Sequence, residues 1–162
     1  MTSEQVQPVE VIVEEVELAL PPGDSRTQRE AEVVILGAVA QQLGVDLAPK
    51  RIYLADRTYV EIDGVSDEPA VLCEVWAHQG APKSAQRNKV IADAFKISFV
   101  GGLQQPRPRL ILAFADPAAA QQFLGRSWYA HALKALGIEV IVIAISADLR
   151  SRIVEAQARQ YR

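Results

Sequence analysis

Cysteine is almost absent from this sequence, and several other features that would assign a function are missing with it. The single Cys73 cannot form an internal disulfide, and no cluster of cysteine and histidine indicates structural zinc. No apolar run approaches the roughly 20 residues that cross a bilayer. The first ten residues lack the basic start and apolar stretch of a secretory signal. These absences predict a cytoplasmic protein that does not enter a membrane.

The motifs of three large enzyme classes are also missing. The chain has no glycine-rich dinucleotide fingerprint after a strand, no phosphate-binding loop with its lysine, and no G-x-S-x-G nucleophile elbow. It has 162 residues, of which 49% are apolar and 23% charged, a balance that suits one globular domain. We expect that domain to cover residues 24–162, after an acidic segment over residues 1–23 that is an edge strand or a tether to a partner protein.

Charge is unevenly distributed along the chain. The net charge is −3, but residues 1–24 hold six acids and no lysine or arginine. Residues 83–109 hold six basic side chains against the single acid Asp93. A local excess of this kind suits a polyanionic partner such as nucleic acid, although a solvated helix face is the commoner explanation.

Hydrophobic periodicity predicts an α/β domain with a mixed sheet. A helix from about residue 24 to Leu43 precedes three runs of period two, "RIYLA", "TYVEI" and "AVLCEVWA", which indicate an antiparallel meander joined through the loop "GVSDEP". Then follow a helix in "SAQRNKVIADAFKISFVGG", a buried strand "RLILAFA", a helix over residues 117–136, a second buried strand "IEVIVIAI" and a closing helix from about Ala147. We expect the last two strands to run parallel.

The first predicted helix carries an acid on its apolar side. Its expected apolar stripe consists of Val33, Leu36, Val39, Ala40 and Leu43. Glu32 lies four residues before Leu36 and therefore shares that side. The ordinary explanation is a stem that packs while the carboxylate reaches water, and it has about the same weight as a role in a site.

Two further acids interrupt the predicted meander. Alternation places Asp63 at the end of the second strand and Glu74 within the third, so that both point to one face if the two strands pair. Carboxylates held that close repel each other unless a proton or a cation lies between them. Mg²⁺ is often bound by only one or two protein carboxylates together with substrate phosphate. The pattern therefore favours a metal site.

The order of elements, the Asp that ends the second strand and the acid on the third resemble the PD-(D/E)XK nuclease superfamily, which has the restriction-endonuclease-like fold. The resemblance covers roughly residues 25–145. It implies hydrolysis of phosphodiester bonds in nucleic acid, with Mg²⁺ or Mn²⁺ held by Asp63, Glu74 and the first-helix acid Glu32. It also implies a helix–βββ–helix–β–helix–β order, and we expect a homo-oligomer.

The sequence departs from the family pattern at one position. The acid-X-Lys motif of the family would place a lysine where this chain has Trp76. Some members supply the basic group from the following helix, and here Lys83, Lys89 and Lys96 are available. Gln86, Lys89 and Asp93 share one side of that helix. We take Lys89 as the migrated lysine and Gln86 as its neighbour in the site. The alternative is a catalytically inactive subunit of the same fold that serves in binding or assembly.

Three other residues have weaker claims to the site. His78 follows the third strand and has the pKa range of a general base or a metal ligand, but an exposed loop histidine without a role is commoner. Asp67 is an alternative to Asp63 as a ligand. Cys73 lies on the face opposite Glu74, so we expect it to be buried and unreactive.

Overall fold

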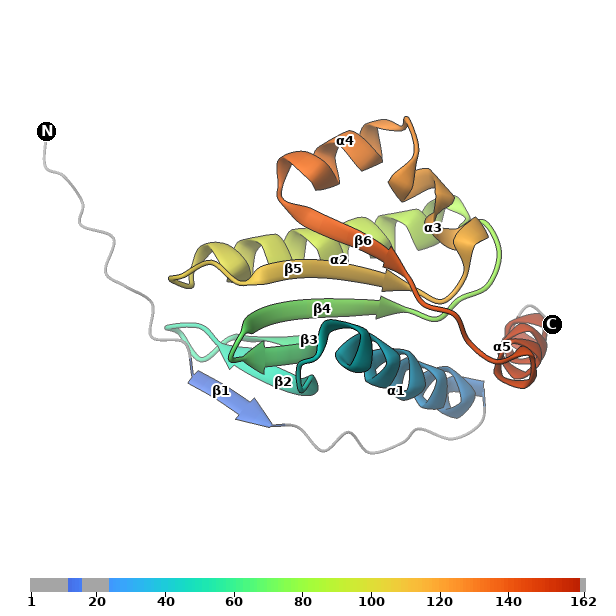
Figure 1. The fold of residues 1–162 in the computed structure, drawn as a ribbon, viewed down its shortest axis with the longest axis horizontal. Coiled ribbons are helices and arrows are strands. Elements are labelled where there is room, and N and C mark those ends of the chain that lie inside the picture. The colour runs from blue at the N-terminus through green and yellow to red at the C-terminus, as the bar shows by residue number, and fades with distance from the viewer. Residues whose placement is uncertain (1–11, 16–23, 161–162) are drawn as a thin grey trace, which may run out of the picture.

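The computed structural model describes residues 12–15 and 24–160, which form a mixed sheet flanked by helices (Figure 1). Its elements are β1 (Ile12–Glu15), α1 (Asp24–Leu43), β2 (Ala48–Tyr53), β3 (Tyr59–Asp67), β4 (Ala70–Trp76), α2 (Ser84–Gly102), β5 (Arg109–Phe114), α3 (Pro117–Leu124), α4 (Trp128–Ala135), β6 (Ile138–Val142) and α5 (Ala147–Gln160). The predicted α/β class and its mixed sheet are confirmed.

The six strands lie side by side in chain order, from β1 at one edge to β6 at the other. Pairing is antiparallel from β1 to β4 and parallel from β4 to β6. The predicted meander and the parallel pairing of the last two strands are therefore confirmed. Within the acidic segment, residues 12–15 form the edge strand β1, and the rest of residues 1–23 lies outside the described part.

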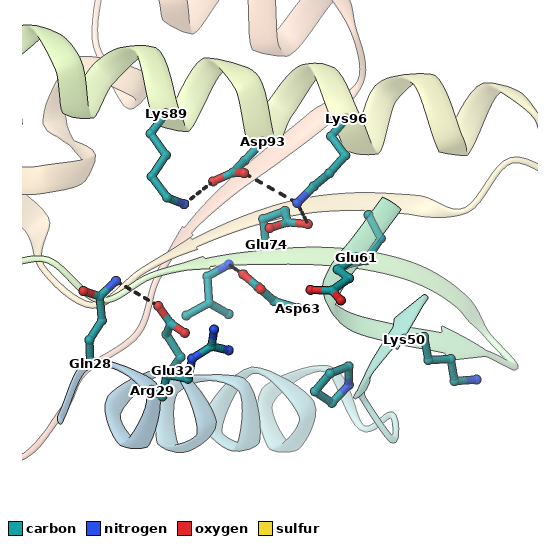
Figure 2. A pocket seen from close by; sticks show the side chains of 13 residues that line it. Gln28, Arg29, Glu32, Lys50, Glu61, Asp63, Glu74, Lys89, Asp93 and Lys96 are labelled. Atoms are coloured by element: carbon teal, nitrogen blue, oxygen red, sulfur yellow. Dashed lines mark hydrogen bonds and ion pairs between the residues drawn. The ribbon is translucent and has the colours of Figure 1, made fainter. Parts of the chain in front are cut away.

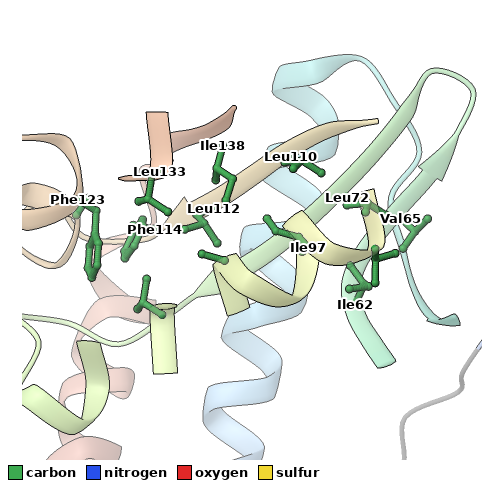
Figure 3. Packing of buried hydrophobic residues seen from close by; sticks show 14 of the residues in the cluster. Ile62, Val65, Leu72, Ile97, Leu110, Leu112, Phe114, Phe123, Leu133 and Ile138 are labelled. Carbon is green, nitrogen blue, oxygen red and sulfur yellow. The ribbon is translucent and has the colours of Figure 1, made fainter. Parts of the chain in front are cut away.

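Each face of the sheet buries its own apolar core. On one face α1 and α5 pack against each other, and the core there includes Ile35 and Cys73. On the other face α2, α3 and α4 cover a core that includes Leu72, Ile97 and Phe114 (Figure 3). Because β4 and β5 are covered on both faces, their sequences are apolar almost throughout.

Helix α1 has the predicted bounds, and Leu36 and Val39 of its predicted apolar stripe are buried, but Val33 is not. It ends before Gly44, whose φ of 67° is the left-handed conformation common after a helix. Ile35 and Leu36 are buried, whereas Val33, placed in the predicted stripe, is 66% exposed. The apolar stripe therefore passes through Ile35, and the prediction for Val33 was wrong.

The single helix predicted over residues 117–136 is instead two helices, α3 and α4. The first ends before Gly125, and Ser127 begins the second by accepting a hydrogen bond from the Ala130 N–H at 3.2 Å. The Ser127 hydroxyl also donates to the Gln122 carbonyl. Glycine after a helix and serine before one are the usual residue types at such a break.

Strand β3 extends further than its sequence pattern predicted. Residues 64–67, expected in a loop, pair with β4, so the connection between the two strands is a tight turn. Against β2, the three-residue step from Ile62 to Val65 in β3 opposes a two-residue step from Ala48 to Lys50. The extra residue makes a β-bulge, which bends the strand beside Asp63.

In the described part of the chain, no helix is long and apolar enough to cross a membrane.

Candidate functional site

A cavity of about 530 Å³ opens where β3 and β4 separate, between α1 on one side of the sheet and α2 on the other (Figure 2). Most of its lining side chains are charged. The acids are Glu32, Glu61, Asp63, Glu74 and Asp93, and the bases are Arg29, Lys50, Lys89 and Lys96. Acids and bases from five elements thus face one space, which is the arrangement of a binding or catalytic site rather than of a core.

Asp63 lies at the point where the two strands part. The regular pairing of β3 with β4 runs from Asp67 back to Gly64, which pairs with Cys73. Beyond that pair, the Asp63 side chain takes the place of a backbone partner, because its Oδ2 accepts a hydrogen bond of 2.9 Å from the Val75 N–H. The carboxylate is thereby fixed in the gap between the strands, close to Glu74.

Glu74 is a carboxyl group held almost entirely out of water. Its side chain is 4% exposed and belongs to the α2 face of the sheet. Burial, and after it the nearby Asp63 carboxylate, raise the pKa of Glu74 to about 9. The Lys96 ammonium opposes this shift, with its Nζ 2.8 Å from Glu74 Oε1, but it does not outweigh the other two causes. The Glu74 carboxyl group therefore keeps its proton to a higher pH than an exposed glutamate does.

Three side chains from one face of α2 form a chain of ion pairs along the cavity wall. Lys96 Nζ lies 3.5 Å from Asp93 Oδ1, and Lys89 Nζ donates to Asp93 Oδ2 at 3.1 Å. Burial alone would lower the pKa of Lys96, but the Glu74 carboxylate more than offsets it, so that the pKa is raised and Lys96 stays charged. Lys96 is thus the lysine in contact with the central acid.

Glu32 reaches the cavity from α1, on the side opposite Glu74. Its Oε1 accepts a hydrogen bond of 3.1 Å from Gln28 Nε2, and Arg29 lines the same wall. Burial raises the pKa of Glu32, the Gln28 hydrogen bond lowers it, and Asp63 adds to the rise. Glu32 on α1 is therefore close enough to Asp63 for the charge of one carboxylate to affect the pKa of the other.

Not every residue predicted for the site faces the cavity. Gln86 Nε2 lies 2.8 Å from His78 Nε2 instead, and neither residue lines the cavity. Asp67 is exposed and pairs with Lys50 at 2.7 Å, so it is not a substitute for Asp63. Cys73 is buried in the opposite core, as predicted, and burial raises the pKa of its thiol. Gln86 therefore lies outside this cavity, because its side chain contacts His78 at the first turn of α2.

Lys89, the lysine chosen from the sequence, lines the cavity but does not contact Glu74. Its ammonium lies over the Trp76 ring at 5.6 Å from the ring centroid and binds Asp93. Lys96, seven residues further along α2, is the one that reaches Glu74. A spacing of seven returns to the same face of a helix, so the sequence indicated both lysines without showing which strand position each would meet.

The donor set of the cavity suits a small divalent cation only in part. Asp63 and Glu74 supply hard oxygen donors from neighbouring strands, and two carboxylates are enough for Mg²⁺ when water and substrate oxygens complete its shell. Among the described residues, however, no three of the metal-ligating acidic, histidine or cysteine side chains come close enough together to hold an ion. Glu32 is therefore not a third ligand in this arrangement, and the pair Asp63 and Glu74 would hold the ion.

Comparison with known proteins assigns neither a family nor a function to this chain. No protein-family model matches the sequence, and no curated protein matches it. The crystal structure of protein VC1899 from Vibrio cholerae matches with a TM-score of 0.45 and 15% sequence identity. The match covers 85% of this chain and 34% of that chain, so this chain corresponds to about a third of the other protein.

Proposed function

We propose that the chain is a divalent-metal-dependent hydrolase of phosphodiester bonds in nucleic acid. The observation that carries the proposal is the pair Asp63 and Glu74, which line one cavity with the basic side chains of Arg29, Lys89 and Lys96. Carboxylates that repel each other favour a cation between them, and basic side chains around them favour a polyanion.

The order and pairing of the elements support a restriction-endonuclease-like topology. A helix, α1, precedes the antiparallel strands β2, β3 and β4, a second helix, α2, follows, and β5 then pairs parallel to β4. This is the helix–βββ–helix–β order that the resemblance implies. It also accounts for the position of the acids, since the cavity lies at the ends of β3 and β4 and beside both helices.

The side chains of the cavity have distinct roles in the proposed reaction. A divalent cation bound there would activate a water molecule and offset the charge of the scissile phosphate. Asp63 and Glu74 would hold that cation, and the Val75 N–H keeps Asp63 in place. Arg29 on the α1 wall would bind a phosphate oxygen and so orient the backbone of the nucleic acid.

Lys96 replaces Lys89 as the migrated lysine of the proposal. Its ammonium contacts the acid of the acid-X-Lys position, whereas Trp76 occupies the position of the lysine itself. When Glu74 takes up another cation, Lys96 is free to turn towards the attacking water or a phosphate oxygen. Lys89 and Asp93 then act as positioning residues, since Asp93 bonds to both lysines.

A second candidate is a nuclease-fold subunit that binds nucleic acid or a protein without hydrolysing anything. The observation in its favour is that Lys96 already neutralises part of the charge at Glu74, and Glu32 is held by Gln28. In that case the lysine would be a permanent structural counter-ion. The N-terminal acidic segment would be the surface for a protein partner.

Calorimetric titration with Mn²⁺ separates the two candidates. The hydrolase predicts one binding event in the wild type, weakened at least about tenfold in Asp63→Asn and in Glu74→Gln and unchanged in Asp67→Asn, whose side chain is exposed outside the cavity. The absence of binding at millimolar Mn²⁺ in the wild type would instead favour the non-catalytic subunit.

A further inference from the structure

Helix α2 carries a second regular pattern, on a side that faces neither the sheet nor the cavity. Six residues at alternating spacings of three and four are all exposed and uncharged: Ala85, Asn88, Ala92, Phe95, Phe99 and Gly102. Phe95 is 74% exposed and Phe99 46%. The spacing is that of the a and d positions of a heptad repeat, the pattern by which two helices pack along their length. We call these six residues the α2 stripe.

The stripe is separate from the candidate site. Lys89, Asp93 and Lys96 project from another side of α2 towards the cavity, as Figure 2 shows. The buried side of the helix, which includes Val90 and Ile97, packs on the sheet. An exposed pair of phenylalanines therefore remains on the outer side of α2, where nothing in the proposed hydrolysis uses it.

We propose that the α2 stripe joins two copies of the chain by antiparallel contact of their α2 helices. The distribution of side-chain sizes favours this occupant, because the first half of the stripe is small or short and the second half holds both phenylalanines. In an antiparallel pair, Phe95 of one copy meets Ala92 of the other, Phe99 meets Asn88, and Gly102 meets Ala85. Each phenylalanine thus meets a small or short residue, and the end layers pair glycine with alanine. Such packing fills the space between the helices without steric overlap.

The charges beside the stripe permit this pairing. The flanking lysines Lys89 and Lys96 both lie within ion-pair distance of Asp93 of their own chain. Asp93 therefore offsets part of the positive charge that the two flanks present to each other. In an antiparallel pair the same flank of both helices lies on one side, so both cavities would open on that side of the dimer.

The size of the stripe predicts a weak dimer. Eighteen residues of helix, from residue 85 to residue 102, span roughly 27 Å, and a helix with its side chains is about 10 Å wide. A contact of this footprint falls in the class of small, transient interfaces rather than permanent ones. Dimerisation should therefore depend on protein concentration in the micromolar range and above. It does not depend on the proposed hydrolytic activity.

Analytical ultracentrifugation across roughly three decades of concentration, up to about 1 mM, tests the pairing. The average mass of the wild type should rise from 17.7 kDa towards twice that value. Phe95→Glu should remain monomeric with an unchanged circular dichroism spectrum. Val33→Glu, which places the same charge on an equally open position of α1, should dimerise as the wild type does. A wild type that stays monomeric, or equal dimerisation of Phe95→Glu, would overturn the proposal.

Disulfide crosslinking tests the direction of the pair. The double variant Ala85→Cys/Gly102→Cys should form a covalent dimer on oxidation, since a Cβ at Gly102 meets nothing within 4 Å. The two cysteines of one chain are about 25 Å apart along the helix and cannot bridge each other. Either single variant should give no covalent dimer, because Cys73 is buried. Crosslinking by the single Ala85→Cys variant would indicate parallel helices and overturn the antiparallel register.

A DNA-binding measurement tests whether the α2 stripe contacts nucleic acid instead of a second copy of the chain. Exposed aromatic side chains can stack on nucleic-acid bases. If the wild type is monomeric and Phe95→Glu weakens its binding to single-stranded DNA while Val33→Glu does not, the stripe belongs to nucleic acid and the dimer proposal fails.

Discussion

Glu74 and Lys96 are the residues on which the electrostatics of the cavity depend. The buried carboxyl group has a pKa of about 9 because burial and Asp63 both disfavour its charged form. Lys96 contacts it at 2.8 Å and keeps its own charge. Below a pH of about 9, the value set by the pKa of Glu74, the contact therefore joins a protonated carboxyl group to a charged ammonium, and a cation that bound Glu74 would compete with its proton.

The raised pKa of Glu74 predicts a pH dependence of stability. Between its ordinary value near 4.5 and about 9, the carboxyl group holds a proton in the folded state that it lacks in the unfolded chain. Folding thus takes up a proton, so the free energy of unfolding falls as the pH rises through this range, by up to about 1.4 kcal/mol per pH unit. Glu74→Gln should remove this contribution.

Urea unfolding of the wild type and of Glu74→Gln at pH 6, 7, 8 and 9 measures the difference. The advantage of the variant should grow with pH. Glu139→Gln is the control, because an Arg109 hydrogen bond lowers the pKa of Glu139 and its titration lies below this range. Parallel pH profiles of the wild type and Glu74→Gln would contradict the assignment of a buried, protonated Glu74.

The two lysines of α2 should differ in their effect on hydrolysis. Lys96→Met removes the ammonium in contact with Glu74, so we expect cleavage to fall about a hundredfold or more. Lys89→Met leaves that contact intact and should lower cleavage less than about tenfold. Single-turnover rates of the two variants at one pH check the order, and a larger loss in Lys89→Met would restore Lys89 as the migrated lysine.

At the scale of the elements, the sequence was most informative where periodicity was clear. The bounds of α1, the antiparallel strands and the two buried parallel strands follow from spacing and from residues such as Gly44. The bulge in β3 could not be predicted, because it depends on the register against β2 rather than on alternation within β3. The bulge lies beside Asp63, whose side chain bonds to the Val75 N–H. Alternation within the strands predicted that Asp63 and Glu74 lie close together, but it did not predict this contact.

The sequence also could not show which lysine on one face of α2 contacts Glu74. Spacing placed Lys89 and Lys96 on one face of α2, but only the packed distance between α2 and β4 shows that Lys96 meets Glu74. Gln86 lies partly on that face, but its side chain contacts His78 instead. Likewise, Val33 and Ile35 are both apolar residues of α1, and the sheet decides which of them is buried.

The burial of Ile35 and the exposure of Val33 on α1 predict different effects on stability. Ile35 is fully buried against the sheet, so Ile35→Ala should lower the free energy of unfolding by about 2–5 kcal/mol. Val33→Ala, at a position 66% exposed, should change it by less than about 0.5 kcal/mol. Urea unfolding of both variants measures the two values. Equal losses of stability would contradict the burial of Ile35 and the exposure of Val33.

At the scale of the whole molecule, the cavity depends on parts of the chain that are far apart in sequence. Glu32 comes from α1, Asp63 and Glu74 from adjacent strands, and Lys96 from α2, so the site forms only when both faces of the sheet are covered. The outer side of α2 remains available to a second copy. The proposed hydrolysis and the proposed dimer would thus use different sides of α2.

Cleavage of labelled single-stranded DNA, duplex DNA and RNA in Mg²⁺ or Mn²⁺ tests whether the chain is a metal-dependent hydrolase. The wild type should be compared with Asp63→Asn, Glu74→Gln and the exposed control Asp67→Asn, all purified identically. We expect metal-dependent cleavage of at least one substrate by the wild type and by Asp67→Asn, and a loss of at least about a hundredfold in both cavity variants. Cleavage that persists unchanged in Asp63→Asn and Glu74→Gln, or its absence from the wild type on all three substrates, would contradict it.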